Sequence, residues 1–158
     1  MSKQIAHRRS VSLAPLAPQA FVAGIIGAVL TDGFLSISQH VSPMAVWQHI
    51  AAAVVGDVAS TSASYAVLGV AIHLVIALIW AYLYAFAAYE LNLLQKWVFS
   101  GIVWGIVVDV VMDLVLASRG ALEPLTVRSV LYGLITNVIF YGLPVAWYLS
   151  RSVRTASR

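Results

Sequence analysis

Long apolar stretches separated by short polar segments dominate this chain. Four of them reach the length of about 17–25 mainly apolar residues that a membrane-spanning helix needs. They cover about residues 20–37, 66–89, 97–118 and 130–149. A helix without a polar face is surrounded by lipid or by protein, and backbone groups in hydrocarbon must be satisfied within the segment. The pattern therefore predicts an all-α fold, an integral membrane four-helix bundle.

The connection between the first two predicted spans is long and contains no Lys or Arg. Within it, Ser42 followed by Pro43 is typical of a helix start, with the serine as N-cap and the proline at the first helical position. The apolar residues that follow predict a short helix over about 43–55, ended near Gly56. This helix is too short to cross the bilayer, so we expect it to be interfacial, on the outer side, or re-entrant.

Composition supports a membrane protein and excludes several other classes. Hydrophobic residues make up 61% of the 158 residues and charged residues 9%, against roughly 25% charged residues in a soluble domain. The mean hydropathy is +0.92. So few charges cannot cover a soluble surface, which excludes a soluble enzyme, a nucleic-acid-binding protein and a disordered chain. The absence of cysteine excludes disulfides, iron–sulfur clusters and thiolate metal sites.

Positive charge is distributed unevenly between the two ends of the predicted spans. With four spans, both termini lie on one side, together with seven of the nine basic residues: Lys3, Arg8, Arg9, Lys96, Arg151, Arg154 and Arg158. The other side holds Arg119 and Arg128. The positive-inside rule then predicts a cytoplasmic N-terminal tail (1–19), a single transmembrane domain (20–150) and a cytoplasmic basic tail (151–158).

The start of the chain also has features of a secretory signal peptide. Three basic residues, Lys3, Arg8 and Arg9, precede an apolar stretch, and the segment 36–38 resembles a small-x-small cleavage site. Asp32 interrupts the apolar stretch, and this favours an uncleaved first span.

The two halves of the chain align with each other. The first and third spans align without gaps over 24–32 and 101–109, with small residues four apart ahead of an aspartate. Aligned pairs in the second and fourth spans are Gly69 with Gly133, His73 with Asn137, and Tyr84 with Tyr148. Aligned spans run in the same direction, so the halves are predicted to be two parallel helical-hairpin repeats. The alternative is a chance alignment of glycine-rich apolar segments.

Rows of small residues occur in the first and third spans. Ala20, Gly24 and Ala28 form a small-xxx-small row, and Gly101 with Gly105 forms a GxxxG. Such rows let helix backbones approach closely in a membrane. We expect them to pack the helices of one chain, with a homo-oligomer or a larger membrane complex as the alternative.

Five polar residues within the spans form the candidate site: Asp32, His73, Asp109, Asp113 and Asn137. At about 1.5 Å rise per residue, all five are predicted to lie in the outer half of the membrane, roughly 7–14 Å below the interface. An Asp near the bilayer centre costs about 2.5–3.5 kcal/mol on insertion scales, so such side chains face the bundle interior or water. The pattern therefore predicts one shared polar pocket that opens outward.

This predicted pocket has three functional interpretations and one structural alternative. Its carboxylate and imidazole groups are suited to bind a small cation or a metal, to pass protons, or to hold a polar solute between repeats. Alternatively, the aspartates only hold helices together by hydrogen bonds, as in a structural or accessory subunit. No catalytic motif or paired haem ligand is present in the sequence, so we expect neither an enzyme nor a cofactor.

Two short stretches resemble a known family. Residues 68–77, with the sequence LGVAIHLVIA, and the Gly-Leu-Pro at 142–144 before the basic tail are similar to small bacterial inner-membrane proteins of the YagU-like type. The resemblance covers about 20–150, and its motifs are short and apolar. It implies a protein of the bacterial cytoplasmic (inner) membrane with about four spans, and it carries over no catalytic residue.

Overall fold

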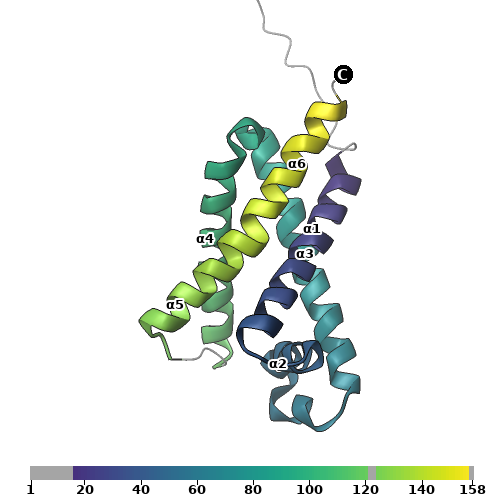
Figure 1. Cartoon of the computed structure of the whole chain (residues 1–158), viewed down its shortest axis with the longest axis vertical. Helices are drawn as coiled ribbons and strands as arrows, with labels where there is room; N and C mark the ends of the chain where they lie inside the picture. Colours follow the sequence, from purple (N-terminus) through teal and green to yellow (C-terminus); the bar gives the residue numbers. More distant parts are fainter. Residues whose placement is uncertain (1–15, 121–123, 157–158) are drawn as a thin grey trace, which may run out of the picture.

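The computed structural model describes residues 16–120 and 124–156 of the chain. Within these ranges the chain forms helices joined by turns, and no strand (Figure 1). The predicted tails, 1–19 and 151–158, lie partly outside the described residues. Their basic side chains before residue 16 and after residue 152 lie outside them entirely.

Four helical segments of the described chain are long and apolar enough to cross a membrane. Three are α1 (Ala17–Ser38), α3 (Ser64–Glu90) and α4 (Trp97–Ser118), the last preceded by the 3₁₀ turn η3 (Leu93–Lys96). The fourth is continuous but changes helix type: α5 (Val127–Leu134), η4 (Ile135–Gly142) and α6 (Leu143–Ala156). The prediction of an all-α bundle with four candidate spans is therefore confirmed, and the chain is a multi-pass membrane protein.

A short helix, α2 (Pro43–Val55), lies across one end of the bundle (Figure 1). The Ser42 side chain accepts a hydrogen bond from the Ala45 N–H at 3.2 Å, as expected of an N-cap. Gly56 ends the helix with a φ of 76°, a conformation that other residues seldom adopt. The 3₁₀ segment η2 (Gly56–Thr61) then leads to α3. The bounds of α2 match the short helix predicted over 43–55.

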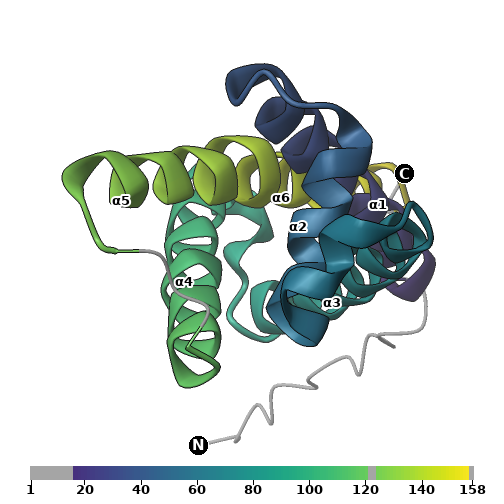
Figure 2. The same ribbon diagram turned by 90° about the horizontal axis from the view of Figure 1, so that it is seen from below.

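The spans pack in the order α4, fourth span, α1, α3. The segment η4–α6 lies between α4 and α1, and α1 packs on α3, as both views show (Figures 1 and 2). The core between them is rich in alanine, with Tyr84, Tyr141, Val145 and Leu149 as its larger members. Large apolar side chains such as Val67, Phe99 and Leu114 are exposed on the outside. Small residues inside and large apolar ones outside are what a lipid environment favours.

Both predicted rows of small residues are buried between helices of this chain. Gly105 shows how closely the helices approach. A Cβ added there would lie 2.5 Å from the Cα of Val138 and 2.6 Å from the Asn137 carbonyl oxygen, both in η4. The backbones of α4 and η4 are therefore in direct contact, as the GxxxG pattern predicts.

The fourth span contains a π-helix, η4, directly before Pro144. Leu143 donates its N–H to the carbonyl of Val138, five residues back, which is the π-helical pattern. Proline has no N–H, and its ring clashes with the helical turn that precedes it. The wider π-helical turn before Pro144 relieves this clash. The wider turn contains Asn137, one of the predicted site residues.

Candidate functional site

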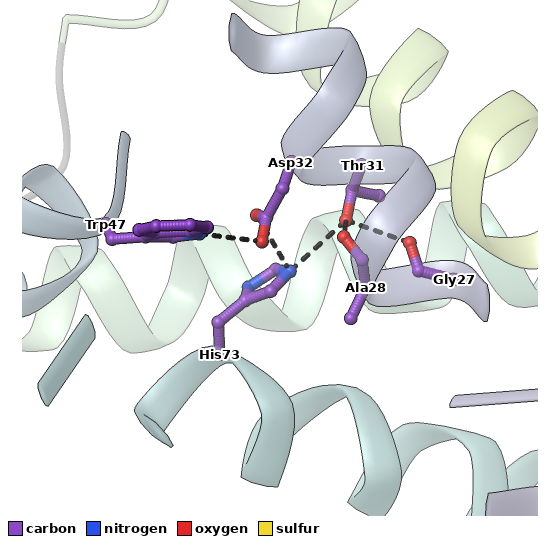
Figure 3. Close-up of polar contacts among 6 residues, drawn as sticks. All are labelled: Gly27, Ala28, Thr31, Asp32, Trp47 and His73. Atoms are coloured by element: carbon purple, nitrogen blue, oxygen red, sulfur yellow. Dashed lines mark hydrogen bonds and ion pairs between the residues drawn. The ribbon is translucent and has the colours of Figure 1, made fainter. Parts of the chain in front are cut away.

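Four of the five predicted site residues form two pairs, one in each half of the chain. In the first half, Asp32 of α1 faces His73 of α3, with 3.2 Å between Oδ1 and Nε2 (Figure 3). The other oxygen, Oδ2, accepts a hydrogen bond from the indole N–H of Trp47 in α2 at 2.9 Å. Helices α1, α2 and α3 therefore meet at one carboxylate.

A hydroxyl group completes this first pair. Thr31 Oγ1 lies 2.9 Å from the carbonyl oxygen of Ala28 and 3.0 Å from that of Gly27, and it donates its single hydrogen to them. It also lies 3.2 Å from His73 Nε2. If the hydroxyl hydrogen stays on these carbonyl groups, Nε2 is the donor in the contact with Thr31. His73 Nε2 thus lies between the Thr31 hydroxyl and the Asp32 carboxylate (Figure 3).

The Asp32 carboxylate is only half satisfied. Its Oδ1 is buried and makes no hydrogen bond within the described chain, although it lies within ion-pair distance of His73. The two side chains keep some exposure, 18% for Asp32 and 22% for His73. One carboxylate oxygen thus lies beside an ionisable ring without a hydrogen bond to it.

The second half holds a different pair at the aligned positions. Asp109 of α4 is buried, with 6% exposed. The side-chain amide of Asn137 in η4 donates to its Oδ1 at 2.9 Å and to the Gly133 carbonyl at 3.2 Å. This pair ties α4 to the fourth span and contains one ionisable group.

Asp113 lies one helical turn after Asp109 on α4 and is partly exposed. Within the described chain it makes no hydrogen bond and no ion pair. Two carboxylates one turn apart repel each other, so the sequence predicts that at least one is protonated or neutralised by His73 or a bound cation. In the structure the hydrogen-bond partner of Asp109 is Asn137.

Between the two pairs lies the interface of α1 with the fourth span, which is aromatic. Phe34 stacks on Phe140 with 4.3 Å between ring centroids, and Tyr132 packs at 5.3 Å from Phe34. The hydroxyl groups of Ser38 and Tyr132 are hydrogen-bonded. No hydrogen bond or ion pair between described residues joins one pair to the other. The shared pocket stays a prediction, while the observed contacts define two separate pairs.

The structure adds three residues that were not predicted to belong to the site: Trp47, Thr31 and Arg119. Arg119, at the end of α4, donates to the carbonyl groups of Ala53 and Val54 at 3.0 and 3.4 Å and so holds the C-terminal end of α2. A hollow of about 420 Å³ lies beside this contact, next to Asp57. The position of Thr31 beside Asp32 was a usable signal, but no sequence pattern links Arg119 or Trp47 to their partners.

Neither a group of metal-binding side chains nor a similar protein indicates what the site does. Among residues 16–120 and 124–156, no three His, Asp or Glu side chains are grouped so that they would hold a metal ion. No protein-family model, curated protein or solved structure matches the chain. The resemblance to YagU-like proteins therefore stays a prediction, and the function has to be argued from the geometry.

Proposed function

We propose that this chain is a small membrane protein that binds, and passes across the membrane, a proton or a small cation at the Asp32–His73 pair. The observation that carries the proposal is the Asp32 Oδ1 atom, which is buried, makes no hydrogen bond to any described residue and lies 3.2 Å from His73 Nε2. A buried carboxylate oxygen that makes no hydrogen bond is costly to keep charged. A proton on the carboxylate, a positive charge on the ring or a bound cation removes that penalty.

The chemistry of the two side chains supports this role. Histidine is the side chain that most often changes charge near neutral pH. Ionisable residues within membrane spans are associated with proton relays and ion pathways. The partial exposure of both groups provides access, and Trp47 holds α2 over the carboxylate. We therefore assign the exchange step to Asp32 and His73, with α2 as the covering element.

Orientation and the repeat belong to the same proposal. The excess of Lys and Arg near the termini supports cytoplasmic termini in a bacterial inner membrane, with α2 on the outer side. What supports the repeat is that the aligned residues pair in the same way, Asp32 with His73 and Asp109 with Asn137. The proton or cation would then enter from the outer side.

A structural or accessory subunit is the second candidate, and the Asp109–Asn137 bond favours it. Asp109 is buried, Asn137 is partly exposed, and a good hydrogen bond between them joins two helices. Polar side chains in membrane bundles commonly act in this way. If the first pair did the same, the chain would have no exchange site.

Proton flux into vesicles tests the proposal. The full chain is reconstituted into proteoliposomes that contain a pH-sensitive dye, and an acid pulse is applied outside, with and without a Na⁺ or K⁺ gradient. We expect flux above empty vesicles for the wild type, and loss of that flux in Asp32→Asn and His73→Gln. Asp57→Asn, which removes an exposed carboxylate of η2, is the matched control and should retain the flux.

The same experiment has results that contradict the proposal. Wild-type flux in Asp32→Asn would remove the pair from the pathway. If the wild type moves neither protons nor cations while the variants only melt earlier, the pair holds helices together and the accessory role is correct.

A further inference from the structure

A groove on the lipid-facing surface of the bundle lies between α4 and the fourth span, and none of the four paired residues lines it. Its volume is about 380 Å³. Trp97 and Val98 at the start of α4 form one wall, and Ile139, Leu143, Pro144 and Trp147 form the other. The lining is almost entirely apolar, so in a bilayer this groove is filled by hydrocarbon.

The groove follows from the close contact of two glycines. Gly101 of α4 meets Gly142 of η4, and a Cβ added to Gly101 would lie 3.0 Å from the Gly142 carbonyl oxygen and from the Ala146 Cβ. The backbones are therefore close along this line. The larger side chains beside it project outward and form the two walls of the groove.

A basic residue stands at one end of each wall. On α6, the guanidinium group of Arg151 lies over the ring of Trp147, 4.9 Å from its centroid. On the other wall, the exposed Lys96 directly precedes Trp97. Tryptophan at the membrane–water interface with a neighbouring cation is the arrangement found at the level of lipid headgroups.

This end of the groove is distant from the proposed exchange pair. Tyr148 of α6 donates a hydrogen bond to Gln19, at the start of α1. Asp32 lies near the other end of α1. The groove and the Asp32–His73 pair are therefore at opposite ends of the bundle, and the inference below is independent of the proposed function.

We propose that this groove binds one anionic phospholipid, with an acyl chain between Trp97 and Trp147 and the phosphate beside Arg151. Basic sites between transmembrane helices select anionic headgroups. Guanidinium groups match phosphate oxygens well, and contact with the Trp147 ring places the Arg151 guanidinium at this end of the groove. Apolar walls and a cation at one end together fit the two parts of a phospholipid.

Native mass spectrometry of the full chain in detergent tests this site. Phosphatidylglycerol and phosphatidylcholine with identical acyl chains are added in equal amounts, and the retained lipid is counted. One cation near the phosphate is expected to favour the anionic lipid by about fivefold. Arg151→Gln should reduce this preference to near parity, whereas Arg128→Gln, which removes an exposed charge from α5 at the opposite end, should retain it.

A second pair of variants tests the apolar walls. Ile139→Trp fills the groove and should lower the retention of both lipids. Ile79→Trp, at a site of similar exposure on α3 (52% against 50%), should leave retention unchanged. This comparison does not depend on Arg151, so it stands even where Arg151→Gln folds poorly.

Three results would overturn the lipid assignment. Equal retention of the two lipids by the wild type means that the groove has no preference for an anionic headgroup. Equal effects of Arg151→Gln and Arg128→Gln mean that only overall charge is sensed. Displacement of phosphatidylglycerol by inorganic phosphate, at matched ionic strength, means a site for a free anion.

Discussion

The two halves of the molecule place a carboxylate at aligned positions and give it different partners. In the first half Asp32 faces an ionisable ring, and both groups are partly exposed. In the second half Asp109 is buried and bonded to the amide of Asn137, which does not change charge. The difference in the partner, His in one half and Asn in the other, leaves two ionisable groups in the first pair and one in the second.

The short helix α2 makes the second difference between the halves. In the first half, Gly69 leaves room for the backbone of Trp47, so α2 packs directly on α3. In the second half the aligned Gly133 leaves room for a carboxylate, since a Cβ there would lie 2.5 Å from Asp109 Oδ1. The aligned glycines thus admit a covering helix in one half and the aspartate itself in the other.

The largest effect is expected at the contact between α4 and η4. Gly105→Val places a branched side chain against the backbone of η4, and overpacking of this kind costs about 3 kcal/mol. The aligned position in the first half is Ala28, which is buried without needing glycine. Thermal melting in detergent measures the loss of stability. Gly33→Ala is the control, because no atom lies within 4 Å of the added Cβ, and equal melting of the two variants would contradict the close contact.

A smaller loss is expected when each aspartate is replaced by leucine. Asp109→Leu removes a buried acceptor and leaves the Asn137 amide with one acceptor fewer, which costs about 1–3 kcal/mol. Asp32→Leu should cost less, because the Asp32 pair is partly exposed. Asp109→Asn keeps the shape and should melt close to the wild type. The comparison fails if Asp32→Leu is the more destabilised of the two leucine variants.

The smallest effect concerns the covering helix. Trp47→Phe removes the indole N–H that binds Asp32 and should cost about 1 kcal/mol. Trp104→Phe removes an indole N–H that has no partner within the described chain, so this matched change should cost less. Protease sensitivity of α2, measured beside the melting temperature, should rise for Trp47→Phe alone. An equal response of both variants would mean that the Trp47–Asp32 bond does not hold α2.

The sequence predicts the helices well because their signals are local. The length of each apolar stretch predicts the four spans, and the cap at Ser42 with the break at Gly56 predicts the bounds of α2. Which helices are neighbours is not a local property. Spans that are apolar on all sides do not show which face meets which partner, so the separation into two pairs could not be predicted.

Two features of the site depend on contacts between distant parts of the chain. The bond between Trp47 and Asp32 exists because α2 folds back over α1 and α3, and its sequence carries no sign of the partner. The π-helix depends on Pro144 together with the close approach of α4 to η4. The proline is plain in the sequence, but the π-helical turn that relieves its clash with the preceding turn could not be predicted from it.

Infrared difference spectra of the protein in bilayers, recorded as the pH is lowered, test most directly whether the two aligned pairs differ in function. Protonation of a carboxylate produces a carbonyl stretching band, and the variants identify its origin. The predicted result is a band that is lost in Asp32→Asn, shifts along the pH axis in His73→Gln and is unchanged in Asp109→Asn. A band that is lost in Asp109→Asn and kept in Asp32→Asn would contradict the assignment of proton exchange to the first pair.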